Sequence, residues 1–197
     1  MQLTFDSLGE ILWVLGIIAW YVIRYPFERR AKRVRVVKES RSLSDSIGLA
    51  AALFGLAVFP AFYLLTDFPE RADFLASLWS IAAGALLFAL ALWVFRISHK
   101  ALGRNWSITL EIRDQHNLIS TGPYALVRHP MYTSFLLMAV GQFLLLSNWI
   151  VGLVGLLGFA TLFFLRVDKE EHMMLESFGP QYRDYMERTK RIIPYLY

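Results

Sequence analysis

The chain of 197 residues contains no cysteine. Disulfides, thiolate nucleophiles and metal ions held by thiolates are therefore excluded. A Gly-x-Gly-x-x-Gly run, which marks a dinucleotide-binding fold, is also absent. The chain instead has an excess of apolar side chains: 56% of its residues are hydrophobic, against roughly 45–50% in soluble domains. This composition points to a membrane protein.

The apolar residues are concentrated in five runs. Leu8–Tyr25, Leu43–Thr66 and Phe74–Phe95 approach or exceed the roughly 20 residues needed to cross a bilayer core. Tyr132–Ser147 and Trp149–Leu165 are shorter, and they are so close in sequence that we expect a tight helical hairpin. The runs predict an all-α integral membrane protein with five transmembrane helices, in one domain that covers residues 1–197.

The charges between the runs are unevenly distributed. Basic residues crowd Arg24–Arg41 after the first run, Arg96–Arg128 after the third and Arg166–Arg191 after the fifth. The second loop has three acids and only one basic residue, Arg71. Because cytoplasmic loops are rich in Lys and Arg, the N-terminus is expected outside and the C-terminus in the cytoplasm. Topology then accounts for the net charge of +4, and no nucleic acid is expected as a partner.

Small residues recur at close spacing in two of the runs. Gly152, Gly155 and Gly158 stand at every third residue of the fifth run, and Ala51 and Gly55 lie four apart in the second. A phosphate-binding loop is one interpretation of the glycines, but no strand precedes them. Small residues allow membrane helices to approach closely, so we expect helix contacts at these positions.

Ionisable residues gather at the predicted cytoplasmic boundary, in residues 116–132 before the fourth run and in residues 166–171 after the fifth. Such groups are costly at a membrane boundary unless they bind something. Both segments fall on the same side of the predicted membrane. They can therefore form one site.

The first of these segments contains a turn and a helix start. Gly122 and the proline after it mark a turn, whose backbone N–H groups and Tyr124 could hold a cofactor. Pro130 suits the first turn of the next helix. The positive end of that helix would lie beside His129, which could be structural or could contact a ligand.

The second segment has structural and functional interpretations. Arg166 could reach lipid phosphate, or its planar fork could orient a carboxylate. Glu170 lies four residues on, where it can pair with Arg166 on the same helical face. Glu170 and Glu171 could be a solvated helix start, or they could face a cationic or hydroxyl-bearing partner. Apolar residues from Leu175 onward then predict an amphipathic C-terminal helix in the cytoplasm, either a lid under the site or a helix on the membrane.

Together these residues resemble the isoprenylcysteine carboxyl methyltransferase family. The shared pattern is His-x-Leu, Gly-x-Tyr, Arg-His-Pro-x-Tyr, an apolar hairpin, Arg-x-x-x-Glu-Glu and Phe-Gly-x-x-Tyr-x-x-Tyr. Here it is formed by His116, Leu118, Gly122, Tyr124, Arg128, His129, Pro130, Tyr132, Arg166, Glu170, Glu171, Phe178, Gly179, Tyr182 and Tyr185. The match covers roughly residues 102–197. Ser134 departs from it, because members that act on prenylated proteins usually have Gly there, and this leaves the acceptor open.

The resemblance implies S-adenosylmethionine as methyl donor, held without a nucleotide-binding domain. The expected cofactor-binding residues are His116, Leu118, Gly122, Tyr124, Arg128, His129, Pro130, Tyr132, Glu170 and Glu171. Arg166 and Glu170 are the expected catalytic residues, and no metal is expected. Residues 102–197 would carry the chemistry on a scaffold formed by residues 1–101. The expected partners are membrane lipids and a lipophilic small-molecule or lipidated acceptor.

Several acceptors remain open. A carboxylate is ionised at neutral pH and needs no general base, and Arg166 could hold it. A phospholipid amine would need a base, which Glu170 or Glu171 could supply, and a small thiol is a third acceptor. Membrane sterol reductases, which use NADPH, have a similar Arg-His-Pro segment but usually more spans. The clustering of ionisable groups disfavours a non-enzymatic scaffold.

The charge distribution generates a topological prediction. A reporter fused after Tyr197 should be cytoplasmic and one fused before Met1 should not, because the basic loops hold their side of the chain in the cytoplasm. Activity of the fused reporters in intact cells measures this. A cytoplasmic N-terminus would contradict the five-span arrangement.

Overall fold

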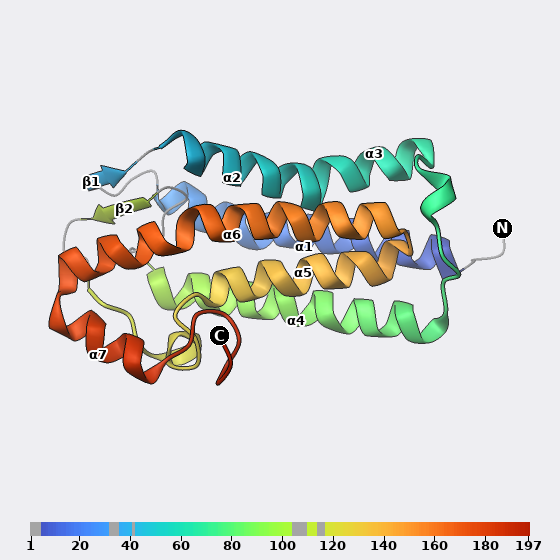
Figure 1. The fold of residues 1–197 in the computed structure, drawn as a ribbon. Coiled ribbons are helices and arrows are strands. Elements are labelled where there is room, and N and C mark those ends of the chain that lie inside the picture. The colour runs from blue at the N-terminus through green and yellow to red at the C-terminus, as the bar shows by residue number, and fades with distance from the viewer. Residues whose placement is uncertain (1–4, 32–35, 41, 104–109, 114–116) are drawn as a thin grey trace.

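A computed structural model describes residues 5–31, 36–40, 42–103, 110–113 and 117–197. Long helices lie side by side along one axis, as Figure 1 shows. In chain order the α-helices are α1 (Phe5–Ala31), α2 (Leu43–Leu53), α3 (Phe59–Thr66), α4 (Leu78–Leu102), α5 (Pro130–Leu146), α6 (Trp149–Phe178) and α7 (Pro180–Arg188). The all-helical membrane class predicted from the sequence is confirmed.

The second apolar run forms one continuous helical rod with a local widening. A π-helical turn, η1 (Phe54–Val58), joins α2 to α3 without a break. The rod begins at Ser42, whose side chain accepts a hydrogen bond from the backbone of Asp45, while the Asp45 carboxylate accepts one from the Ser42 backbone. This reciprocal cap satisfies backbone donors that the first helical turn leaves unpaired.

Within the described residues, four helical rods are long and apolar enough to cross a membrane: Phe5–Ala31, Leu43–Thr66, Leu78–Leu102 and Trp149–Phe178. α5 is apolar but has only 17 residues, so the count of five spans stays a prediction. Large apolar side chains such as Leu65, Trp79, Leu86 and Phe164 are exposed along the rods. A soluble monomer would not display so many, and lipid is the solvent that suits them.

α6 is longer than the apolar run that predicts it. The run ends at Leu165, yet the helix continues to Phe178 and therefore carries Arg166 and both glutamates. It ends at Gly179, which has a positive φ of 52°, a conformation that glycine adopts without strain. Pro180 then starts the short α7.

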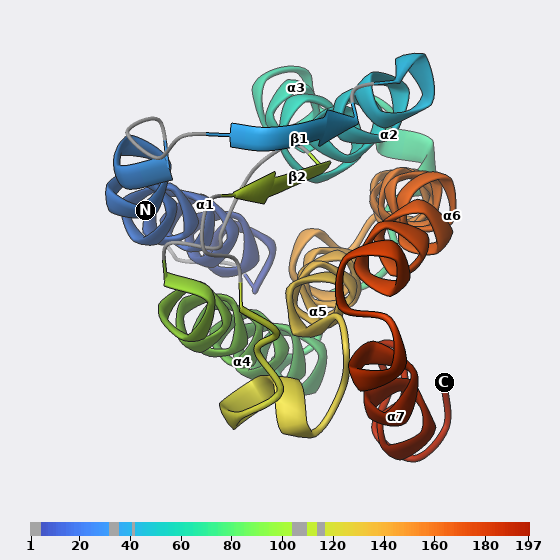
Figure 2. The same cartoon turned by 90° about the vertical axis from the view of Figure 1, so that its left-hand side faces the viewer.

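Two short strands lie beside the helix ends. β1 (Val36–Ser40) follows α1 and pairs antiparallel with β2 (Leu110–Arg113), which follows α4. Figure 2 shows the pair crossing the end of the bundle between α1 and α2. The strand pair therefore joins the connection after α1 to the connection after α4.

α5 lies in the middle of the bundle, as the end-on view in Figure 2 shows. It packs against α1, α4 and α6, while α2 packs against α6. The predicted small-residue contacts are confirmed. A Cβ at Gly55 would lie 2.5 Å from the carbonyl oxygen of Val154, and one at Gly158 would lie 2.5 Å from that of Ala51. Because glycine has no side chain, α6 can approach both α2 and η1 at this distance.

One buried polar contact crosses the centre of the bundle. The indole N–H of Trp13 donates to the Gln142 side-chain oxygen at 3.2 Å. The Gln142 amide in turn donates to the carbonyls of Gly55 at 2.9 Å and Val151 at 3.2 Å. These bonds link α1, α5, η1 and α6, and we call Trp13, Gln142 and Gly55 the polar tie. Its groups are satisfied where no water is available.

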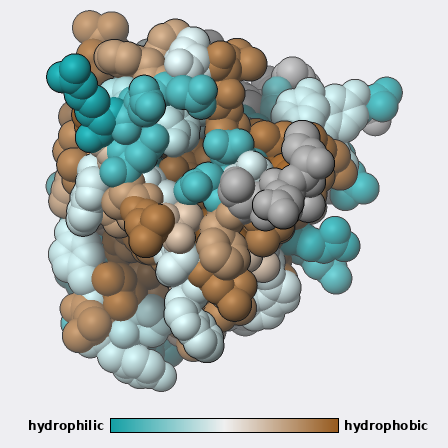
Figure 3. Space-filling view, turned by 90° about the vertical axis from the view of Figure 1, so that its right-hand side faces the viewer, coloured by the Kyte–Doolittle hydropathy of each residue, from teal (hydrophilic) through white to brown (hydrophobic). Residues whose placement is uncertain are grey.

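The opposite end of the bundle holds the hairpin between α5 and α6. Asn148 caps α6 by accepting from the backbone N–H groups of Ile150 and Val151, and its amide donates to Asp73. Tyr63 also donates to Asp73, at 2.9 Å. Hydrophilic residues gather among apolar ones on this end of the molecule, which Figure 3 views directly.

The glycine contacts generate a stability prediction. Gly158→Leu should lower the thermal unfolding temperature in detergent, because the side chain would push α2 away from α6 at a cost of about 1–3 kcal/mol. Leu157→Phe is the matched control, since Leu157 is 65% exposed on the neighbouring face of the same helix. Equal unfolding temperatures for the two variants would contradict the packing argument.

Candidate active site

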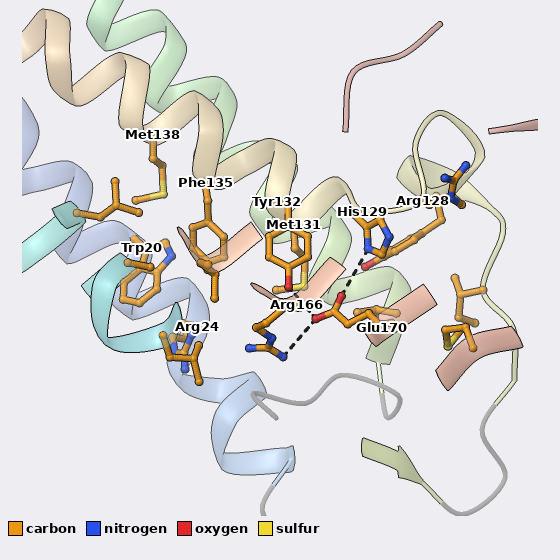
Figure 4. A pocket seen from close by; sticks show the side chains of 18 of the residues that line it. Trp20, Arg24, Arg128, His129, Met131, Tyr132, Phe135, Met138, Arg166 and Glu170 are labelled. Carbon is orange, nitrogen blue, oxygen red and sulfur yellow. Dashed lines mark hydrogen bonds and ion pairs between the residues drawn. The ribbon is translucent and has the colours of Figure 1, made fainter. Parts of the chain in front are cut away.

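A cavity of about 620 Å³ lies where α1, α2, α5, α6 and α7 converge. Figure 4 shows its course along α5, from Met138 at one end through Phe135 and Tyr132 to His129 at the other. The end near Met138 is lined by apolar side chains, and the end near His129 is lined by ionisable and aromatic ones. We call them the apolar compartment and the polar compartment.

Glu170 is the centre of the polar compartment. The hydroxyl of Tyr132 donates to its carboxylate at 2.7 Å, and Arg166 pairs with the same oxygen at 3.2 Å. The other carboxylate oxygen lies 3.5 Å from Nδ1 of His129. Figure 4 shows Glu170 between Arg166 and His129. The predicted pairing of Arg166 with Glu170 on one helical face is confirmed.

Glu171 lies behind the cavity wall and forms ion pairs with three basic side chains. Its carboxylate is 2.9 Å from Nε of Arg128, 3.2 Å from Nε2 of His129 and 2.7 Å from Nη2 of Arg191. The residue is only 3% exposed. Removing one partner of a buried ion pair costs about 3–5 kcal/mol, so Glu171 fixes the loop that carries Arg128 and His129.

The backbone around His129 is held by the chain that follows α7. The N–H of Arg128 donates to the Lys190 carbonyl at 2.7 Å, and that of His129 donates to the Arg191 carbonyl at 2.9 Å. The Arg128 side chain also donates to the carbonyls of Met186 and Thr189. α5 starts at Pro130, as the sequence predicts.

His129 has a carboxylate facing each ring nitrogen. Burial disfavours the charged imidazolium, but hydrogen bonds and charge attraction from Glu170 and Glu171 outweigh burial and raise the pKa of His129 above 6.5. Since both nitrogens face acceptors, the doubly protonated ring satisfies both contacts. The folded site therefore favours a cationic His129.

The structure brings most of the predicted site residues to one cavity. Its lining includes Leu118, Tyr124, Arg128, His129, Tyr132, Arg166 and Glu170. Three predicted residues do not line the cavity. Gly122 is exposed and has a φ of 63°, and Pro130 is the first residue of α5. Glu171 lies behind the cavity wall, in contact with His129. His116 lies outside the described residues. The catalytic and cofactor-binding roles of all these residues remain predictions.

The isoprenylcysteine carboxyl methyltransferase family model matches residues 78–176, from the start of α4 to near the end of α6. The chain belongs to this family. The match contains Arg128, His129, Arg166 and both glutamates. In this multi-pass membrane fold all of them except Glu171 line one cavity, and Glu171 lies directly behind its wall.

Curated relatives carry the family name. A Rattus norvegicus protein-S-isoprenylcysteine O-methyltransferase is 30% identical over 60% of this chain and 42% of its own length. The Saccharomyces cerevisiae enzyme of that name is 25% identical over 94% of this chain and 79% of its own. The chain thus spans less than half of the rat relative.

A solved structure shares the fold. The eukaryotic intramembrane Ras methyltransferase of the isoprenylcysteine carboxyl methyltransferase family aligns with a TM-score of 0.56. The alignment covers 98% of this chain and 65% of that chain, at 21% sequence identity. At that identity the likeness establishes the arrangement of the helices.

Several lining residues of this family member were not singled out as site residues from the sequence. Arg24 and Trp20 come from α1, where the Arg24 guanidinium lies 5.2 Å from the centroid of the Trp20 indole. In the sequence, Arg24 was counted among the basic residues that indicate topology. Tyr182 and Tyr185 of α7 line the polar compartment, so α7 packs under the site. The cavity is lined by both halves of the chain. The assignment of the chemistry to residues 102–197 remains a prediction.

Arg191, the outer partner of Glu171, was also missed. It reaches Glu171 and Asp168 at 2.7 Å each. The signal available in the sequence was weak: a basic residue twenty positions after an acid does not indicate contact unless the path of the chain is known.

The environment of His129 generates a pH prediction. A folded-state pKa above the unfolded value gives a stabilisation that is complete below about pH 6.5 and is lost as the pH rises through the folded pKa. His129→Gln should therefore lower the unfolding temperature most below about pH 6.5, and the difference from wild type should narrow at higher pH.

Thermal unfolding in detergent across this pH range measures the effect. His172→Gln is the control, because the His172 side chain is 76% exposed on the same helix as the glutamates. A constant difference at every pH would mean that His129 does not titrate against Glu170 and Glu171.

Proposed function

We propose that this chain transfers a methyl group from S-adenosylmethionine to the carboxylate of a lipophilic acceptor. The observation that carries the proposal is one cavity that joins an apolar compartment between membrane helices to a compartment bearing Arg166, Glu170 and His129. An acceptor with an apolar tail and a charged end needs both environments at once. A cavity of about 620 Å³ is within the usual range for small-molecule sites.

The residues of the polar compartment fit a cationic donor that also bears a carboxylate. When bound, S-adenosylmethionine supplies an electrophilic methyl group on a positively charged sulfur. The carboxylate of Glu170 and the rings of Tyr124, Tyr182 and Tyr185 line the space and would attract that charge. His129, whose ring nitrogens already face Glu170 and Glu171, adds positive charge on this side of the cavity and so favours the donor's carboxylate. The side chains of the polar compartment can therefore bind the donor and orient it.

Arg166 is proposed to hold the acceptor carboxylate. It is 6% exposed, lines the cavity and is kept in place by Glu170. Its planar guanidinium can make parallel hydrogen bonds to a carboxylate and leave one oxygen directed at the polar compartment. The acceptor is already ionised, so the protein needs no base: it aligns the reacting atoms and excludes water.

The relatives favour an isoprenylcysteine carboxyl group as the acceptor class, since their names specify S-isoprenylcysteine O-methylation. Ser134, which departs from the family pattern, is fully buried and donates to the Met131 carbonyl. It is absent from the cavity lining. The departure therefore gives no reason to exclude this acceptor. The positive-inside argument puts the polar compartment at the cytoplasmic face.

Methylation of an amine is less well supported. It would require Glu170 to accept a proton. Its carboxylate oxygens already face Tyr132, Arg166 and His129. An amine acceptor would have to displace one of these partners before Glu170 could act.

The role of Arg166 generates a prediction that separates the acceptor classes. Arg166→Lys should lower methyl transfer to an N-acylated S-isoprenylcysteine by at least about tenfold, because Lys cannot reproduce the two parallel hydrogen bonds. Transfer from isotopically labelled S-adenosylmethionine in detergent measures the rate. Calorimetry should show nearly unchanged donor affinity.

Arg183→Lys is the control, since Arg183 is exposed on α7. Full turnover in Arg166→Lys, together with loss of turnover but not of donor binding in Glu170→Gln, would support an amine acceptor instead. Binding of NADPH in place of S-adenosylmethionine would favour a reductase and would contradict the proposal as a whole.

A further inference from the structure

The apolar compartment has a definite depth. Its lining runs along α1 from Arg24 to Ile17, and along α5 from Tyr132 to Met138. At a helix rise of about 1.5 Å per residue, these segments correspond to a depth of roughly 10 Å. The compartment therefore extends only part of the way along the helices that surround it.

The polar tie lies directly beyond the deep end. Trp13 is four residues, one helical turn, before Ile17, and Gln142 is four residues after Met138. Gly55, the third member, is adjacent to the lining residue Leu56. Trp13 is 3% exposed and Gln142 is 1% exposed. The hydrogen bonds of the tie therefore bring α1, α5 and η1 together where the lining stops.

We propose that the polar tie is the floor of the apolar compartment and limits how much of an acceptor tail the protein holds. This inference rests on the proposed function and adds a specificity determinant to it. With carbon–carbon bonds of about 1.5 Å, an extended tail advances about 1.25 Å per carbon, so a depth of roughly 10 Å holds about eight chain carbons. This is the chain length of about two isoprene units.

Longer tails leave the compartment sideways. Tyr21 of α1 and Leu53 of α2 both line the cavity, yet they are 57% and 58% exposed on the outside of the bundle. The cavity therefore reaches the molecular surface between these helices, at the level of the membrane. Carbons beyond the floor turn into lipid there and add nothing to recognition.

The physical basis of the limit is exclusion of volume. Each tail carbon inside the compartment gains close packing contacts with its walls. A carbon beyond the floor contacts only lipid, which is as apolar as the walls and gives no such gain. A tail pushed past the floor would have to break buried hydrogen bonds and leave Gln142 unsatisfied, which is costly. The floor therefore limits the length of acceptor tail that fits in the compartment, and the residues beside the floor set that length.

Ala57 tests the floor, because it lines the cavity beside Gly55 and Leu56. The probes are N-acylated cysteines with free carboxylates and S-alkyl tails of about four to about sixteen carbons, spaced to bracket the eight expected from the bond geometry. In the wild type, kcat/KM for methyl transfer should rise up to about eight carbons and then stay level. Ala57→Phe should lower transfer to the eight-carbon tail about tenfold, as overpacking predicts, and leave the shortest tail unchanged.

Val58→Phe is the matched control, since Val58 is the next residue and is 50% exposed. It should keep the wild-type length profile. Trp13→Ala provides the opposite change: removing the indole should extend the rising part of the profile to longer tails. If that variant does not fold, Ala57→Phe and Val58→Phe decide the question, because the shortest tail reports whether each fold is intact.

The outcomes test the proposed floor and the proposed reaction independently. Methyl transfer that is indifferent to tail length, or identical profiles for Ala57→Phe and Val58→Phe, would overturn the floor and leave the reaction standing. If no probe is methylated, the same series is measured as competitors of a labelled S-alkyl probe. A binding profile that levels off at about eight carbons then supports the floor without the reaction, and a flat profile overturns it.

Discussion

The site depends on one constraint: charges buried at the end of a membrane bundle must neutralise one another. Glu170 and Glu171 are adjacent on α6, so they point to different sides of the helix, and His129 lies between them with a nitrogen toward each. Glu170 is then turned toward the cavity with Arg166, and Glu171 is turned away toward Arg128 and Arg191. Buried carboxylates without such partners would be too costly to keep ionised.

The contacts of Glu171 behind the cavity wall explain why segments far apart in the chain meet. Arg128 and His129 precede α5, while Arg191 follows α7, and Glu171 bonds to all three. Their backbones also pair, through the hydrogen bonds from Arg128 and His129 to Lys190 and Arg191. α7 is thereby held across the polar compartment, where its tyrosines complete the wall. A residue such as Arg191 supports the site without touching the cavity.

Close packing on one side of the bundle leaves space on the other. The small residues of α6 and α2 bring those helices together, while α1 packs on α4 and α5. α1 and α2 are thus held by different neighbours, and the cavity opens between them. The polar tie closes the deeper part of that space, because Gln142 reaches both Trp13 and the Gly55 carbonyl. The same contacts that stabilise the bundle therefore shape the compartment proposed for the acceptor tail.

The sequence by itself determined the membrane class, the apolar runs, the helix start at Pro130 and the pairing of Arg166 with Glu170, because each depends on composition or on residues within one helical turn. It also identified the family motif. Only the tertiary structure decided that Glu171 faces Arg191, that Trp20 and Arg24 line the cavity and that Gln142 closes it. Those contacts join residues separated by 20 to 129 positions or by whole helices, and no local periodicity encodes which helix faces meet. They depend on which helix faces and loops meet, and that is settled only when the whole chain packs.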